Sequence, residues 1–100
     1  MYFLIGIYYF ERKWLIKARA AFDKALYLRK LSFGVDHASC AECLYNIALT
    51  AKLQDEREEA VEIFQQVLAI YQKKVGTQSL ERAKTLEQLG RLALEDDQIE

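Results

Sequence analysis

The sequence repeats itself with a period of 42 residues. Two stretches, 17–34 and 59–76, carry the same residue types at matching positions. The matched pairs are Ala18 and Ala60, Phe22 and Phe64, Leu26 and Leu68, and Gly34 and Gly76. The register continues outside them: Leu44, Ile47, Ala48 and Ala51 recur as Leu86, Leu89, Gly90 and Ala93, and Ile5-Gly6 precedes Ile47-Ala48 by one period. A unit of this length cannot bury its apolar face alone, so the chain is predicted to be a helical solenoid that presents a surface.

The repeated units are predicted to be helical. Apolar residues in the second copy follow the i, i+3, i+4, i+7 spacing of an amphipathic helix, at Ala60, Ile63, Phe64, Val67, Leu68 and Tyr71. The chain has no proline and four glycines, so it offers few strand or turn signals. Breaks are expected at residues 11–14, near residues 54–56 and at two glycine loops. The sequence therefore predicts five helices, each antiparallel to the next, at about 1–12, 15–32, 37–53, 57–74 and 79–95.

The glycine loops predict how the helices end and begin. Gly34 and Gly76 stand where a left-handed residue would close the longer helix of each repeat. After the first loop, Asp36 is expected to cap the next helix. After the second loop, Thr77 or Ser79 is expected to do the same.

Length and composition limit the class of protein. One hundred residues with 52% apolar content are enough for one domain, 1–100, with a core that needs no disulfide, metal or cofactor. Residues 1–50 carry seven basic and four acidic side chains, and residues 51–100 carry seven and eleven, a balance that does not favour nucleic-acid binding. No stretch has the ~20 apolar residues of a membrane span. The apolar N-terminus lacks the features of a signal peptide, and with two cysteines only three residues apart, a cytoplasmic location is expected.

The repeat resembles the tetratricopeptide repeat (TPR). That family has a small residue late in its first helix, then an alanine and an aromatic residue in its second. The corresponding residues are Gly6, Ala18 and Phe22, then Ala48, Ala60 and Phe64, then Gly90. The resemblance covers essentially the whole chain and implies an all-α, right-handed α-solenoid of antiparallel helix pairs. It would hold about two and a half repeats, in units of approximately 1–36, 37–78 and 79–100.

Within that family, the long period and one loop resemble kinesin light chains. The residues concerned are Gly34-Val35-Asp36-His37, followed by Leu44-Tyr45-Asn46-Ile47-Ala48. The second loop keeps only its glycine. The chain also departs from the family pattern, because Lys13, Asp55 and Asp97 replace the usual turn glycine and the closing proline is absent.

The resemblance implies a concave groove, lined by the first helix of each repeat, that binds a partner protein or peptide. By position, it would hold Phe3, Ile7, Tyr45, Asn46, Leu49, Lys52, Lys84, Gln88 and Arg91. Asn46 is the leading candidate because a carboxamide can pair with a peptide backbone, and the alternative is a solvated helix residue. Family members that bind acidic C-termini use five Lys, Arg and Asn side chains. This chain has Phe3, Ile7 and Gln88 at three of those positions, so apolar or aromatic anchors are favoured.

Other candidate sites have simpler explanations. His37, Cys40 and Cys43 have metal-ligand or redox spacing, but no second ligand pair exists, and one period later the two cysteines become Arg82 and Thr85. His37 is instead expected to be a loop or capping residue. The acidic run of Asp55, Glu56, Glu58, Glu59 and Glu62 is expected to be a solvated helix start. Trp14 is expected to pack across the first turn. With one histidine and no phosphate-binding loop, no enzyme is predicted.

A second functional class stays open. Residues 2–10 place apolar groups on every side of the first helix, and such a helix is normally buried all round. Neither end of the solenoid has a polar capping helix. The chain is therefore expected either to bind a partner segment in its groove or to be a structural module that stacks or self-associates through its ends.

Overall fold

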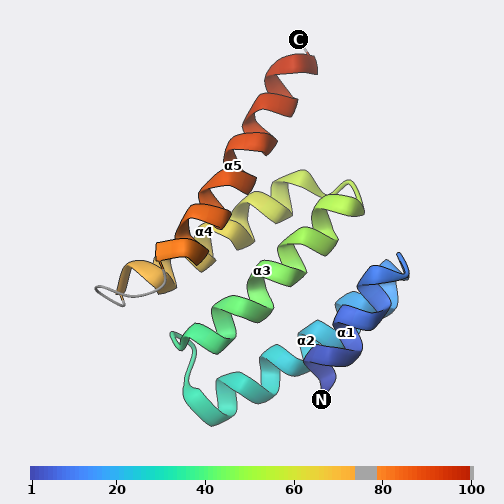
Figure 1. Cartoon of the computed structure of the whole chain (residues 1–100), viewed down its shortest axis with the longest axis vertical. Helices are drawn as coiled ribbons and strands as arrows, with labels where there is room; N and C mark the ends of the chain where they lie inside the picture. The colour runs from blue at the N-terminus through green and yellow to red at the C-terminus, as the bar shows by residue number, and fades with distance from the viewer. Residues whose placement is uncertain (74–78, 100) are drawn as a thin grey trace.

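The computed structural model describes residues 1–73 and 79–99, with side chains described to residue 73 and over 80–94. The described residues form five helices: α1 (Tyr2–Glu11), α2 (Leu15–Phe33), α3 (Ala38–Leu53), α4 (Arg57–Lys73) and α5 (Ser79–Ile99). Each helix packs mainly on the next one along the chain (Figure 1). The all-α prediction is confirmed. Helix α5 runs past residue 95, so Asp97 lies inside a helix and not at the expected turn position.

The core confirms the 42-residue register. The matched pair Phe22 and Phe64 is completely buried, and so is the matched pair Ala18 and Ala60. A β-carbon built on Gly6 would lie 2.6 Å from the ring of Phe22, so the absence of a side chain at Gly6 is what lets α1 lie against α2. In α3, the repeated residues Leu44, Ile47, Ala48 and Ala51 are all buried.

The two helix-pair turns have the same geometry. Lys13 and Asp55, one period apart, have φ angles of 65° and 66°. In the first turn, the Trp14 amide donates to the Tyr9 carbonyl at 2.9 Å, and in the second the Glu56 amide donates to Ala51 at 2.9 Å. These left-handed conformations strain residues other than glycine by roughly 1 kcal/mol or more. The fold therefore imposes the glycine conformation on residues that are not glycine.

The loop between α2 and α3 corrects two predictions. Gly34 has φ 91° but ψ 162°, so it is not the left-handed helical cap that was expected. His37 caps α3, since its Nδ1 accepts from the Ser39 amide at 3.0 Å. The expected cap, Asp36, instead accepts from Lys73 Nζ at 3.0 Å. Gly76, Thr77 and the side chain of Ser79 lie outside the described residues.

Both ends of the helix array expose apolar residues. In α1 only Gly6 is buried and Leu4 is 71% exposed, so the described part of the chain leaves much of this apolar helix uncovered. Helix α5 buries Thr85 and Leu92, whereas Leu94 is 62% exposed. The α5 counterparts of the buried α3 face, Leu86, Gly90 and Ala93, are also exposed. None of the described helices has the length and apolarity needed to cross a membrane.

Candidate functional site: a groove between α1, α3, α4 and α5

A cavity of about 270 Å³ lies where α1, α3, α4 and α5 meet. Its lining consists of Phe3, Glu42, Tyr45, Asn46, Tyr71, Glu81 and Lys84. Four of these residues, Phe3, Tyr45, Asn46 and Lys84, are groove positions predicted from the sequence. The structure thus brings together predicted residues from three helices that are each the first of a pair.

The aromatic walls of the cavity are held by the core beneath them. The ring of Tyr45 meets Phe64 edge-on, with 5.5 Å between ring centroids. The ring of Phe3 lies 5.8 Å from Phe22, and the guanidinium of Arg29 lies over Phe3 at 4.5 Å from its centroid. Both walls therefore rest on the repeated core phenylalanines, and their positions are fixed by packing.

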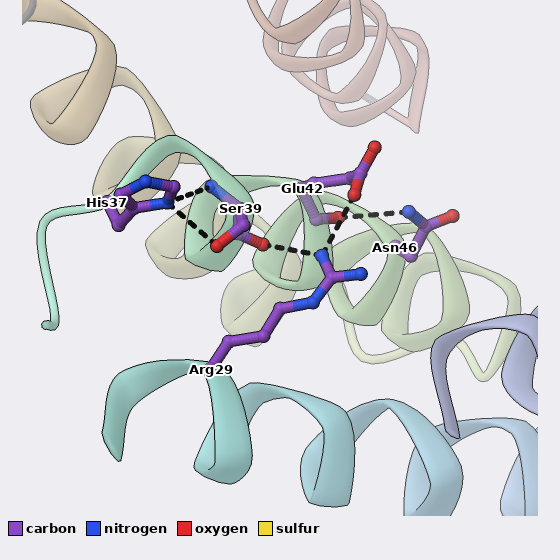
Figure 2. Close-up of polar contacts among 5 residues, drawn as sticks. All are labelled: Arg29, His37, Ser39, Glu42 and Asn46. Atoms are coloured by element: carbon purple, nitrogen blue, oxygen red, sulfur yellow. Dashed lines mark hydrogen bonds and ion pairs between the residues drawn. The ribbon is translucent and has the colours of Figure 1, made fainter. Parts of the chain in front are cut away.

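A hydrogen-bond network fixes the start of α3 beside this cavity (Figure 2). Arg29 reaches across from α2 and its Nη1 donates to the Ser39 carbonyl and to Glu42 Oε1, both at 2.8 Å. Asn46 Nδ2 donates to the Glu42 carbonyl one turn earlier, at 2.9 Å. One amide hydrogen of Asn46 is thus used inside its own helix, while the carboxamide oxygen makes no hydrogen bond to another described residue.

The remaining predicted groove residues lie outside the cavity lining. Lys52 Nζ donates to Gln88 Oε1 at 2.9 Å and so joins α3 to α5. Arg91 pairs with Glu87 on its own helix, at 3.5 Å. Ile7 and Leu49 are half-buried and pack against the core.

Comparison with known proteins identifies the repeat. The family model described as tetratricopeptide repeat matches residues 1–73, the part of the chain that forms α1 to α4. The chain belongs to the tetratricopeptide repeat family. No curated protein matches the sequence. The TPR is a protein-interaction repeat, and the finer resemblance to kinesin light chains stays a prediction.

Three residues of the cavity lining in this TPR were missed by sequence reasoning. Tyr71 belongs to the apolar stripe of α4 and was therefore assigned to the core. Glu42 and Glu81 each stand three residues before a predicted groove residue, Tyr45 and Lys84, and residues three apart share a helix face. The three-residue spacing from Tyr45 and Lys84 could therefore have predicted that Glu42 and Glu81 line the same cavity.

Two carboxylates of the cavity lining act on the Tyr71 hydroxyl in this TPR. Tyr71 is only 4% exposed, and burial raises its pKa to about 12, with further contributions from the charges of Glu81 and Glu42. Both carboxylates oppose ionisation of the Tyr71 hydroxyl. The phenol therefore stays neutral at physiological pH and can both donate and accept a hydrogen bond.

The alkaline titration of Tyr71 is a testable consequence. Because folding raises the pKa of Tyr71 from 10.0 to about 12, its contribution to stability is complete below pH 10 and is lost as the pH rises towards 12. Tyrosine ionisation is followed by near-ultraviolet absorbance as the pH is raised. We expect the titration curve of wild type minus that of Tyr71→Phe to show one tyrosine that ionises near pH 12. A difference curve with its midpoint at pH 10 would contradict a buried Tyr71.

The two cysteines of this TPR lie in its buried core, and the histidine caps α3. Cys40 and Cys43 are completely buried free thiols. Burial raises the pKa of Cys43 to about 11 and also raises that of Cys40, so both stay protonated. No group of three or more metal-binding side chains is arranged around an ion site among the residues that the structure describes.

The acidic run is more than a solvated helix start. Glu59 forms a bidentate ion pair with Arg19 of α2. Arg19 Nη1 donates to Glu59 Oε1 at 2.8 Å, and Arg19 Nη2 donates to Glu59 Oε2 at 2.5 Å. The hydrogen bond to Arg19 lowers the pKa of Glu59, and the same bond raises the pKa of Arg19. This pair ties α4 to α2 across the repeat, whereas Asp55, Glu56, Glu58 and Glu62 are exposed as expected.

Proposed function

We propose that this TPR chain is a protein-interaction scaffold that binds an extended partner segment in the groove between α1, α3 and α5. The observation that supports it is the cavity of about 270 Å³ whose lining includes Phe3, Tyr45, Asn46 and Lys84. Three consecutive first helices contribute these side chains. An extended segment lying across the three helices would touch each repeat in turn.

The lining defines the chemistry of the partner segment. Phe3 and Tyr45 offer aromatic surface for apolar anchors. The carboxamide oxygen of Asn46 and the carboxylates of Glu42 and Glu81 are hydrogen-bond acceptors, which suit the N–H groups of an extended backbone. Lys84 is balanced by Glu81 in the same lining, so the site is not a clamp for an acidic terminus.

The organisation and setting of the chain are part of this proposal. Residues 1–100 would form one domain of two and a half repeats, with units of approximately 1–36, 37–78 and 79–100. Partner binding, and not catalysis, would be its activity. Two buried free thiols suit a reducing cytoplasm, where the chain would act as an adaptor.

Substitution in the groove tests the proposal. A partner segment obtained by pull-down with the isolated chain is expected to bind with a dissociation constant of ~1 to 100 µM, because a short segment must be ordered on binding. We expect Asn46→Ala to cost roughly 1 to 3 kcal/mol of affinity by leaving a partner group unsatisfied. Added salt should have little effect, because the site carries charges of both signs.

The measurement is a fluorescence-polarisation titration of wild type, Asn46→Ala and Tyr45→Ala. Gln66→Ala, an exposed change on α4, is the matched control. Circular dichroism establishes that each variant is folded. Equal affinities for all four proteins would eliminate the groove as the binding site.

A second candidate function is that of a structural module that stacks through its ends. The observation that favours it is the uncovered face of α5, where a β-carbon on Gly90 would have no neighbour within 4 Å. In α3 the matched residue, Ala48, is completely buried. This face would accept another helix of a larger assembly. If the partner binds all groove variants as tightly as wild type, that result would favour this function.

A further inference from the structure

The two helix-pair turns form one edge of the molecule and carry opposite charge. The α1–α2 turn and the α3–α4 turn lie close together, away from the α2–α3 loop (Figure 1). A surface cavity of about 570 Å³ touches both turns and is lined by Lys13, Trp14, Leu15, Ile16, Lys17 and Gln54. We name residues 11–20 the basic turn and residues 53–62 the acidic turn.

The basic turn combines ordered cations with exposed apolar side chains. The guanidinium of Arg12 lies 4.7 Å from the ring centroid of Tyr8, and Lys17 Nζ lies 5.3 Å from that of Trp14. Trp14 is 46% exposed and Ile16 is 79% exposed. Aromatic faces hold the cations in place before any partner arrives, which lowers the entropy cost of pairing them.

Comparison of the two turns shows that the repeat fold does not require the basic and exposed apolar residues of the basic turn. Residues 53–62 occupy the same positions one period later, yet five of them are carboxylates and one is basic, against one carboxylate and four basic residues in 11–20. Trp14 and Ile16 correspond to Glu56 and Glu58. The buried matches Ala18 and Ala60 are unchanged, so the difference is confined to the surface.

We propose that this edge binds a second copy of the chain, with the basic turn of each protomer on the acidic turn of the other. A two-fold axis that lies in the interface plane, between the two turns and perpendicular to the line that joins them, brings both pairs together in the same way. The interface is then isologous, with two equal contacts. This surface is distinct from the groove and from the ends of the solenoid, so the inference does not rest on either function proposed above.

Both charge and apolar surface support a second copy as the occupant. The acidic turn offers Glu58 and Glu62, which are exposed. It also offers Leu53, which is 47% exposed and can cover Ile16 or Trp14 of the partner protomer. Exposed ion pairs alone contribute little, so burial of these apolar side chains supplies the affinity while the charges set the orientation.

Charge reversal tests the interface. Lys13→Glu with Lys17→Glu changes the net charge of the basic turn from +3 to −1, and Glu58→Lys with Glu62→Lys changes that of the acidic turn from −4 to 0. By sedimentation velocity at about 5 to 200 µM protein, we expect wild type to dimerise and to do so at least about tenfold more weakly when salt rises from about 50 to 500 mM. Each double variant alone should be monomeric, and an equimolar mixture of the two should form a heterodimer.

The control is Lys24→Glu with Lys30→Glu, the same change in charge on exposed positions elsewhere on α2. It should dimerise like wild type, and circular dichroism should show every variant folded. A monomeric wild type over the whole concentration range would overturn the proposal. Dimers of both double variants would also overturn it, because they would place the contact elsewhere. An equimolar mixture of the two variants that stays monomeric would overturn it as well.

Discussion

Phe64→Ala is expected to lower the free energy of unfolding by ~3 to 5 kcal/mol. The ring of Phe64 is completely buried and supports Tyr45 at 5.5 Å, so truncation removes its burial and leaves a cavity under the groove wall. For a domain of this size, the loss is a large part of the total stability. The same change should also disorder Tyr45 and so weaken the binding that is proposed for the groove.

Urea denaturation measures the loss, with Gln65→Ala as the control on the exposed side of α4. That control is expected to change stability by less than ~0.5 kcal/mol. A loss below ~1 kcal/mol for Phe64→Ala would show that the ring is not in the core and that the repeat register is wrong.

The same substitution at two matched glycines is expected to act in opposite directions. Gly6→Ala should cost ~1 to 3 kcal/mol, because the new β-carbon would lie 2.6 Å from the buried ring of Phe22. Gly90→Ala should add ~0.5 to 1 kcal/mol, because its β-carbon meets nothing within 4 Å and alanine is the better helix former. The two positions lie in the same register of the repeat, two periods apart.

Thermal and urea unfolding of the two variants side by side would check this pair. Stabilisation by Gly6→Ala would mean that α1 does not approach α2 closely. Destabilisation by Gly90→Ala would mean that another helix already covers α5, for example in a dimer formed through the end of the solenoid.

The sequence predicted the helices well because one physical cause governs them. Apolar spacing decides which residues are helical, and the buried pairs Ala18 with Ala60 and Phe22 with Phe64 show that each repeat buries the same stripe. The turns at Lys13 and Asp55 were also located correctly, since their positions follow from where the stripe stops, whereas the turn expected at Asp97 lies within α5. Lys13 and Asp55 adopt the turn conformation although neither is a glycine.

Details that depend on competition between neighbouring polar groups were not predictable in this way. Asp36 was expected to cap α3, but it pairs with Lys73, which is far away in sequence, and His37 caps the helix. Similarly, Tyr71 fits the core stripe, and only the packing of α5 places it in the groove. The proposed groove residues other than Phe3, Tyr45, Asn46 and Lys84 lie outside the cavity because their own pairings or core contacts hold them.

The neighbour-to-neighbour packing of the helices has a consequence for how the chain opens. Since each helix packs mainly on the next one, an end helix can detach while the others keep their contacts. Helix α3 lies between α2 and α4, whereas α1 and α5 each have one main neighbour. Amide hydrogens should therefore exchange fastest in the outer helices and slowest in α3. Contacts between elements close in sequence also favour rapid folding, so a detached end helix would return quickly.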